Sequence, residues 1–431
     1  MGSARLLQSI LPQRFKTPLP FTHAVAKALG GHHGDWPIAA ELRAATLTQQ
    51  LGGPEWDDVR TALVDALNQA FEPPTGLEAP SDRTAVNGLV TLLSGFVTVA
   101  DWIGSMEDYF PYTEGPIDPA TYAVQAYECA QRALRELDWE QWTPPATEVE
   151  FSELFGLPSP RPTQRAVMAR ADTLVPPALV LIEAPTGVGK TEAALYLADQ
   201  WARVAQQRGL YVAMPTRATS DQMHGRVTQV LQRRYPDLAV APMLIHGLSR
   251  WSQHGSAPEI AQEDAGATSG AELSAESMRW FLPRKRSLLA PFAVGTVDQA
   301  LLAVLQTRHF FVRLFGLSHK TVIFDEVHAY DTYMSELFLR LINWLRAVGA
   351  SVVVLSATLP ESARRDIVQA YSGRDPECLE PTPYPRITWV MDTEVGSEHV
   401  THTDERCVTL TRIGSAADDI ANFLSAILSE G

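Results

Sequence analysis

One short stretch, residues 181–191, constrains the fold of this 431-residue chain more than any other. It reads Leu-Ile-Glu-Ala-Pro-Thr-Gly-Val-Gly-Lys-Thr. An apolar run, 178–182, leads into it, and a run of good helix formers, 192–198, follows it. A strand, a tight glycine-containing loop and a helix in this order are typical of an α/β unit whose loop binds phosphate groups.

The loop has most of the residue types that phosphate binding requires. The strict pattern begins with glycine, where this chain has Ala184. Gly187 and Gly189 let the backbone turn its N–H groups toward a phosphate, Lys190 can reach the β and γ phosphates, and Thr191 can bind Mg²⁺. A strand-to-helix turn beside an unrelated lysine is the alternative, but it does not explain the flanking sequences. The predicted ATP-binding residues are Ala184, Pro185, Thr186, Gly187, Val188, Gly189, Lys190 and Thr191.

A carboxylate pair follows a second apolar run. Asp325 and Glu326 come at the end of a predicted strand, 321–325, where parallel sheets bind their ligands. We expect Asp325 to hold the Mg²⁺ that Thr191 also contacts, and Glu326 to orient or deprotonate the attacking water. Such a pair on an isolated helix is usually a solvated face. Lys190, Asp325 and Glu326 are therefore the predicted catalytic residues.

Further polar residues are predicted near the phosphate. A strand from residue 351 ends in Ser356, Ala357 and Thr358, which are expected to contact the loop at His328 and couple it to the γ-phosphate. The alternative is a plain exit from the strand. Gln164, which precedes the first strand, is expected to recognise adenine with its amide.

Three segments have the composition of nucleic-acid contacts. Pro215, Thr216 and Arg217 follow a strand and begin a helix, which suits a backbone phosphate. Thr296, Asp298 and Gln299 form a similar group. Segment 280–286, Trp-Phe-Leu-Pro-Arg-Lys-Arg, combines aromatic and basic residues that suit single strands, although it also fits an amphipathic surface segment.

The composition limits the class of protein. A net charge of −15 argues against a basic surface over the whole chain, but not against a local basic groove. Cys129, Cys378 and Cys407 form no CxxC motif, which indicates a reducing compartment without structural zinc. No apolar run of membrane-spanning length and no signal peptide is evident, so a cytoplasmic protein without a membrane partner is expected.

The apolar pattern divides the chain into four predicted regions. Residues 1–140 are expected to be helical, 141–162 a proline-rich linker, 163–380 a parallel α/β domain, and 381–431 the start of a connection to a further domain. The predicted helices of the first region are 38–51, 59–71, 85–103 and 119–139. The predicted strands are 178–183, 210–214, 240–245, 292–295, 321–325 and 351–355, then 386–391 and 406–412 before a helix from Ala416.

The order of these motifs resembles that of superfamily 2 DExH helicases. The motifs are Gln164, 184–191, 215–217, 296–299, 325–328 and 356–358. The sequences of segments 280–303 and 325–331 are similar to those of the CRISPR-associated helicase-nuclease of type I systems. The resemblance to this family covers nearly the whole chain. The resemblance implies an HD nuclease fused to a RecA-like domain, ATP-driven movement on single-stranded DNA, DNA cleavage, and recruitment by a guide-RNA surveillance complex.

The resemblance also implies a function for the helical region. Segment 30–36, Gly-Gly-His-His-Gly-Asp-Trp, is similar to the His-His element of that family's nuclease, and 99–105 to its later Asp element. It implies that His32, His33 and Asp101 bind a divalent transition metal (Mn, Fe, Co or Ni). Without the resemblance, adjacent histidines are more often part of an ordinary loop.

The chain departs from the family pattern at both ends. No His-Asp dipeptide occurs, and only 22 residues precede His23, which we do not assign as a ligand. The expectation is a partial all-helical HD domain and one RecA-like domain, truncated at both ends and therefore impaired. Three alternatives stay open: a general DExH DNA or RNA helicase with an unrelated helical N-terminus, a non-catalytic fragment that binds ATP and partners, and the product of a gene remnant.

Overall fold

The computed structural model describes residues 2–44, 52–73, 78–80, 82–115, 117–137, 139, 142–236, 242–245, 287–305, 307–374, 381–392, 394–401, 412–414 and 417–430. Contacts divide the chain into two compact units, Met1–Val400 and Thr401–Gly431. The second unit contains α17 (Ala417–Glu430), the helix predicted to begin at Ala416. The predicted strand 406–412 falls mainly on residues outside the described ranges.

Helices make up the N-terminal region, as the apolar pattern predicts. They are α1 (Gly2–Phe15), α2 (Leu19–Gly30), α3 (Ala39–Ala44), α5 (Asp57–Phe71), α6 (Arg83–Gly104) and α7 (Pro119–Glu136). Asp82 caps α6, because its carboxylate accepts hydrogen bonds from the backbone N–H groups of Thr84 and Ala85. Asp118 caps α7 in the same way through Thr121. The continuation of the predicted helix 38–51 beyond α3 lies outside the described residues.

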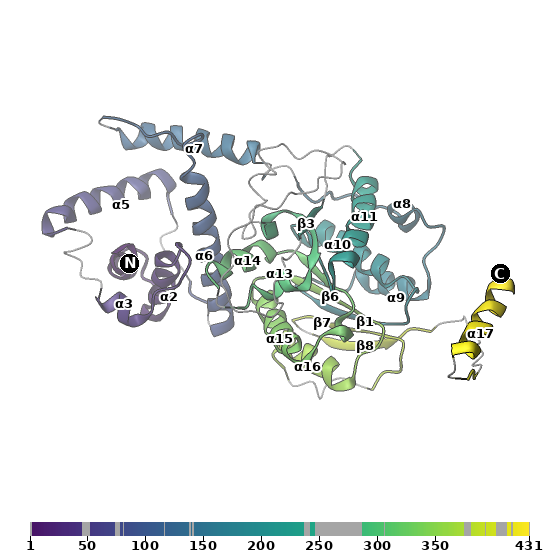
Figure 1. Ribbon diagram of the computed structural model, residues 1–431. Coiled ribbons are helices and arrows are strands. Elements are labelled where there is room, and N and C mark those ends of the chain that lie inside the picture. Colours follow the sequence, from purple (N-terminus) through teal and green to yellow (C-terminus); the bar gives the residue numbers. More distant parts are fainter. Residues whose placement is uncertain are drawn as a thin grey trace. The chain divides into compact units, whose positions relative to one another are not determined.

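An eight-stranded sheet forms the centre of the following region (Figure 1). Its strands are β1 (Leu179–Glu183), β2 (Leu210–Met214), β3 (Met243–Ile245), β4 (Phe292–Thr296), β5 (Thr321–Phe324), β6 (Ser351–Ser356), β7 (Arg386–Val390) and β8 (Val395–His399). They lie in the order β3-β4-β2-β5-β6-β1-β7-β8. The first six in this order are parallel, and β7 and β8 are antiparallel to their neighbours. The predicted parallel sheet is confirmed, and β8 was not predicted.

Helices cover both faces of the sheet, as a parallel sheet requires. Val180 and Ile182 of β1 belong to one apolar cluster, and Leu179 and Leu181 to the other. The first cluster includes residues of α8 (Phe151–Phe155), α9 (Pro162–Ala171), α10 (Lys190–Ala205) and α11 (Arg217–Arg234). The second includes residues of α13 (Val297–Leu301), α14 (Phe310–Leu317), α15 (Thr332–Ala347) and α16 (Glu361–Ser372). The carboxyl ends of the strands are therefore free to present polar loops.

The segment 141–162 is packed against the sheet domain along part of its length. The side chains of Phe151, Leu154 and Phe155 in α8 are buried in the first cluster. The ring of Trp142 lies 4.9 Å from that of Phe292. Helix α8 was not predicted, because five residues are too few to show a helical period.

Helix α6 corrects one expectation from the sequence. No apolar run of membrane-spanning length was predicted, yet α6 meets that criterion by length and composition. The helix packs against α2 and α14, and 44% of its most apolar window is buried. A core helix has the same composition, so α6 is weak evidence for a membrane span.

The contact between α6 and α14 joins the helical region to the sheet domain. Gly95 lies where the two helices meet, and a Cβ atom on it would lie 2.3 Å from the Cβ of Phe315. The same atom would lie 3.1 Å from the carbonyl oxygen of Phe311. Both neighbours are fixed by the backbone of α14, so they cannot move aside independently of that helix.

We expect Gly95→Ala to destabilise this contact. Alanine favours helix by about 1 kcal/mol over glycine, but forcing the two helices apart costs about 1–3 kcal/mol or more. Gly104→Ala, at the end of the same helix with no atom within 4 Å of the added Cβ, is the matched control. Denaturant unfolding followed by tryptophan fluorescence measures both, and a Gly95→Ala protein as stable as the control would contradict the packing.

Candidate nucleotide and metal sites

The loop between β1 and α10 has the backbone that its glycines predict. Gly187 and Gly189 have φ angles of 78° and 89°, a region that other residues rarely adopt. A Cβ atom on Gly189 would lie 2.0 Å from Nε2 of Gln164. The positive φ angle is the main reason for glycine at position 189, and a side chain there would also displace the Gln164 amide.

Lys190 begins α10 and lies almost fully inside the loop, with 8% of its surface exposed. Its ammonium donates hydrogen bonds to the carbonyl oxygens of Ala184, at 2.7 Å, and Pro185, at 3.1 Å. Burial lowers the pKa of Lys190, and the carboxylates of Glu326 and Asp325 partly oppose this effect. The loop thus holds a buried ammonium close to the two predicted catalytic carboxylates.

Asp325 and Glu326 leave the carboxyl end of β5. Burial is the main cause that raises the pKa of Asp325, and the neighbouring Glu326 carboxylate raises it further. One Asp325 carboxylate oxygen accepts the backbone N–H of Glu326 at 2.9 Å. Glu326 has a φ angle of 55°, a conformation that is costly for a residue with a side chain and that is common at functional sites.

His328 connects the carboxylate loop to the end of β6. Its Nε2 atom lies 3.0 Å from a Glu326 carboxylate oxygen, and its Nδ1 atom lies 3.3 Å from Oγ of Ser356. The Ser356 hydroxyl donates to the carbonyl oxygen of Thr358 at 2.8 Å. The structure therefore brings together His328 and the Ser356–Thr358 segment, the residues for which coupling was predicted.

The Gln164 amide is fully engaged within the protein. Its oxygen accepts the backbone N–H of Arg161 at 2.7 Å, and its nitrogen donates to the carbonyl oxygen of Gly189 at 3.2 Å. Arg161 also donates from its guanidinium to the carbonyl oxygen of Gly187. These contacts support the phosphate loop from the side of α9. Adenine recognition by Gln164 stays a prediction.

The residues predicted to contact DNA differ in their exposure. Thr216 and Arg217, at the start of α11, and Asp298, in α13, are exposed, while Pro215 is half-buried. Thr296 and Gln299 are buried. The amide oxygen of Gln299 accepts a hydrogen bond from Arg313 at 3.3 Å. The exposed members are therefore better placed for a direct contact, and segment 280–286 lies outside the described residues.

The predicted metal ligands come together from the turn after α2 and from α6. His32 and His33 follow the end of α2, and Asp101 lies in the last turns of α6. One ligand atom from each of the three lies within 4.8 Å of the others. The backbone carbonyl oxygen of Leu29 lies 2.6 Å from Nδ1 of His32, which leaves Nε2 as its ligand atom. Two imidazoles and a carboxylate are a donor set that suits divalent transition metals.

The loop that carries the two histidines is held on both sides. Thr98 of α6 donates from its hydroxyl to the carbonyl oxygen of His32 at 3.1 Å. The backbone N–H of His309 donates to the carbonyl oxygen of Gly34 at 2.9 Å. Residues of the sheet domain therefore help to position the predicted metal loop. His23 is exposed in α2 and does not belong to the three-residue cluster.

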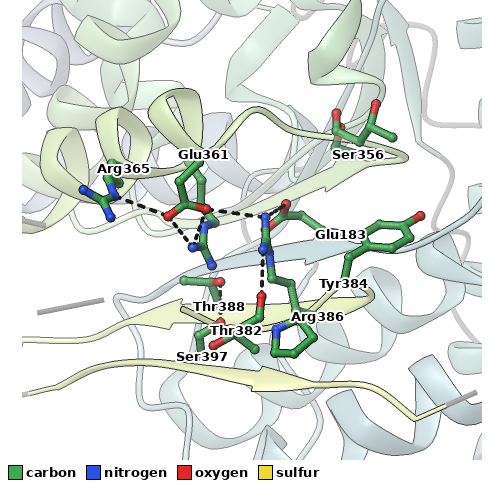
Figure 2. Close-up of polar contacts among 12 residues, drawn as sticks. Glu183, Ser356, Glu361, Arg365, Thr382, Tyr384, Arg386, Thr388 and Ser397 are labelled. Carbon is green, nitrogen blue, oxygen red and sulfur yellow. Dashed lines mark hydrogen bonds and ion pairs between the residues drawn. The ribbon is translucent and has the colours of Figure 1, made fainter. Parts of the chain in front are cut away.

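An ion pair that was not predicted lies at the base of the phosphate loop. Glu183, at the end of β1, pairs with Arg386, at the start of β7 (Figure 2). A glutamate that ends an otherwise apolar strand was the available signal, but its partner depends on the antiparallel register of β7.

Two family models match the chain, one over the predicted metal site and the other over the predicted ATP site. Residues 2–110 match the model described as Cas3, HD domain, and residues 161–367 match the DEAD/DEAH box helicase model. The chain belongs to the Cas3 family. The match over the first region argues against a general helicase with an unrelated helical N-terminus.

Individual relatives agree with this assignment. A CRISPR-associated endonuclease/helicase Cas3 of Thermus thermophilus is 38% identical over 88% of this chain and 40% of its own length. The Escherichia coli protein of the same description is 31% identical over 88% of this chain and 42% of its own length. The crystal structure of T. fusca Cas3-AMPPNP has a TM-score of 0.74 at 31% identity, over 95% of this chain and 46% of that chain. The chain therefore spans less than half the length of these Cas3 relatives.

Proposed function

We propose that this chain forms part of an enzyme that hydrolyses ATP to move along single-stranded DNA and that cleaves the DNA at a metal site. The observation that carries the proposal is the presence of two separate groups in one chain. One is the Lys190 ammonium beside Asp325 and Glu326. The other is the cluster of His32, His33 and Asp101.

The residues of the phosphate loop have defined roles in this proposal. Lys190 would contact the β and γ phosphates of ATP in place of its loop carbonyl partners, and Thr191 and Asp325 would hold the accompanying Mg²⁺. Glu326 orients the attacking water. Its contact with His328, which in turn lies against Ser356, couples loss of the γ-phosphate to the Ser356–Thr358 segment. Residues of the 215–217 and 296–299 segments hold the DNA backbone.

The nuclease site acts through His32, His33 and Asp101. A bound transition metal would lower the pKa of a water molecule and thereby supply a nucleophile for phosphodiester hydrolysis. Thr98 and His309 keep the histidine loop against α6, so the imidazoles stay oriented toward Asp101. A divalent transition metal, Mn, Fe, Co or Ni, suits these ligands.

One structural relative supports a proposal for the cellular role. A structure described as a CRISPR RNA-guided surveillance complex, pre-nicking, contains a chain that matches with a TM-score of 0.63 at 28% identity over 99% of this chain. We propose that this protein likewise acts with a guide-RNA surveillance complex in antiviral defence, in the cytoplasm. Binding to such a complex loaded with target DNA tests this part.

These 431 residues alone are expected to bind ATP–Mg²⁺ weakly and to hydrolyse it slowly. An arginine that reaches an ATP site of this kind from another domain or partner is worth ~10³–10⁵ in rate, and these residues span less than half the length of the Cas3 relatives. Steady-state ATPase assays with and without single-stranded DNA, beside a two-lobed relative, measure this. A comparable DNA-stimulated rate would refute it.

Little nuclease activity is expected of these residues as well. Strong Mn²⁺- or Co²⁺-dependent DNA cleavage that His33→Ala abolishes would contradict this expectation.

A further inference from the structure

The ion pair at the base of the phosphate loop is nearly inaccessible to water. Arg386 donates from Nε and Nη2 to the two carboxylate oxygens of Glu183, both at 2.8 Å (Figure 2). The side chains of Glu183 and Arg386 are 1% and 13% exposed. The two residues face each other in the antiparallel register of β1 and β7.

The Glu183–Arg386 ion pair lies next to the loops of the predicted ATP site. Glu183 immediately precedes Ala184, whose backbone N–H donates to the carbonyl oxygen of Ser356 at 3.2 Å. Arg386 also donates to the carbonyl oxygen of Thr382 at 2.8 Å, which fixes the segment before β7. The pair therefore lies at the point where the phosphate loop leaves the sheet.

Tyr384 makes a second contact from the same segment. Its hydroxyl donates to the carbonyl oxygen of Ala357 at 2.9 Å. Ala357 follows Ser356, whose hydroxyl lies within hydrogen-bond distance of His328. Segment 382–386 thus reaches the ends of two strands, β1 and β6, from which two predicted ATP-site loops depart.

A buried ion pair is a poor source of stability. Removing two charges from water costs about as much as their attraction returns, so an apolar pair of similar volume serves stability equally well. The neighbouring residues of β1, from Leu179 to Ile182, are all apolar. A two-pronged arginine–carboxylate contact instead fixes orientation, because both hydrogen bonds form in one geometry only.

We propose that Glu183, Arg386 and Tyr384 form a brace that positions the ATP site. The brace holds the Ala184–Thr191 loop and the Ser356–Thr358 segment at a fixed separation. Arg386 and Tyr384 are positioning residues in this role and do not touch the nucleotide. The inference rests on the proposed function, since it assumes that this site binds ATP.

Titration with a fluorescent ATP analogue and Mg²⁺, together with thermal unfolding, tests the brace. Arg386→Met is expected to weaken nucleotide binding about tenfold, as is common when a residue that orients a ligand-holding group is lost. Tyr384→Phe, which removes only the hydroxyl, is expected to weaken binding about threefold, the effect of one neutral hydrogen bond.

A double variant separates positioning from stability. Arg386→Met leaves the Glu183 carboxylate buried and unpaired, so it also lowers the unfolding temperature. Glu183→Leu combined with Arg386→Met replaces the ion pair by an apolar pair. This double variant is expected to regain the unfolding temperature while its nucleotide affinity stays about tenfold below that of the wild type.

A matched control removes a different ion pair from the same hairpin. Glu398 of β8 accepts a hydrogen bond from Arg170 at 2.7 Å, and neither residue contacts the ATP-site loops in the described structure. Glu398→Gln is expected to bind nucleotide as the wild type does. Unchanged affinity in Arg386→Met, or recovery of affinity together with stability in the double variant, would overturn the brace. A wild-type chain that binds no nucleotide would instead overturn the proposed function, and the brace with it.

Discussion

Lys190→Met is expected to reduce the affinity for ATP–Mg²⁺ at least thirtyfold. The Lys190 ammonium is buried in its loop, so its attraction to phosphate oxygens is poorly screened by water. Removing one partner from a buried charge pair costs about 2–5 kcal/mol, of which 2 kcal/mol corresponds to thirtyfold. Methionine keeps the apolar stem of the side chain and removes only the charge and its donors.

Calorimetric titration with a non-hydrolysed ATP analogue measures this loss. Lys27→Met is the control, because Lys27 lies in α2, away from the phosphate loop, near the ring of Trp36. Unfolding temperatures of both variants show that the loss is not caused by misfolding. A Lys190→Met protein that binds the analogue as the wild type does would show that Lys190 does not hold the ATP phosphates.

Asp101→Asn and His33→Ala are each expected to reduce transition-metal affinity at least a hundredfold. Each change removes one of the three proposed ligands, whose donor atoms lie within 4.8 Å of one another. Loss of residues that only orient ligands costs about 10–100-fold, so loss of a ligand itself is expected to exceed this range. The same titrations with Mn²⁺, Fe²⁺, Co²⁺ and Ni²⁺ compare the four candidate metals.

Thermal unfolding with and without metal gives an independent reading. A ligand that binds only the folded state at a hundred times its Kd stabilises the protein by about 2.7 kcal/mol. His23→Ala is the control, since His23 is an exposed histidine of α2 outside the cluster. Equal stabilisation of the wild type, His23→Ala and Asp101→Asn would show that the metal binds elsewhere.

The central strands could be predicted because their sequences carry strong local signals. The strand leading to the phosphate loop was predicted at 178–183 and lies at Leu179–Glu183. Helix α6 was predicted at 85–103 and lies at Arg83–Gly104, where Asp82 caps its start. Burial on both faces of the sheet fixes the strand within a few residues, and the capping carboxylate does the same for the start of the helix.

The elements that were missed depend on contacts distant in sequence. Strand β8 reads Val-Gly-Ser-Glu-His and has no apolar alternation, so its pairing with β7 decides its structure. The Arg386–Glu183 pair likewise exists only because β7 runs antiparallel to β1. The burial of Gln299 against Arg313 was also invisible in the sequence, where Gln299 resembled a DNA contact.

The central proposal is that one chain holds a nucleotide site and a separate transition-metal site. Crystals of the chain grown with an ATP analogue, Mg²⁺ and Mn²⁺ test it through anomalous scattering at the manganese edge. The account predicts a peak between His32, His33 and Asp101, and nucleotide phosphates at Lys190 with their cation between Thr191 and Asp325. The absence of a peak at the three ligands, or phosphates bound away from Lys190, would contradict it.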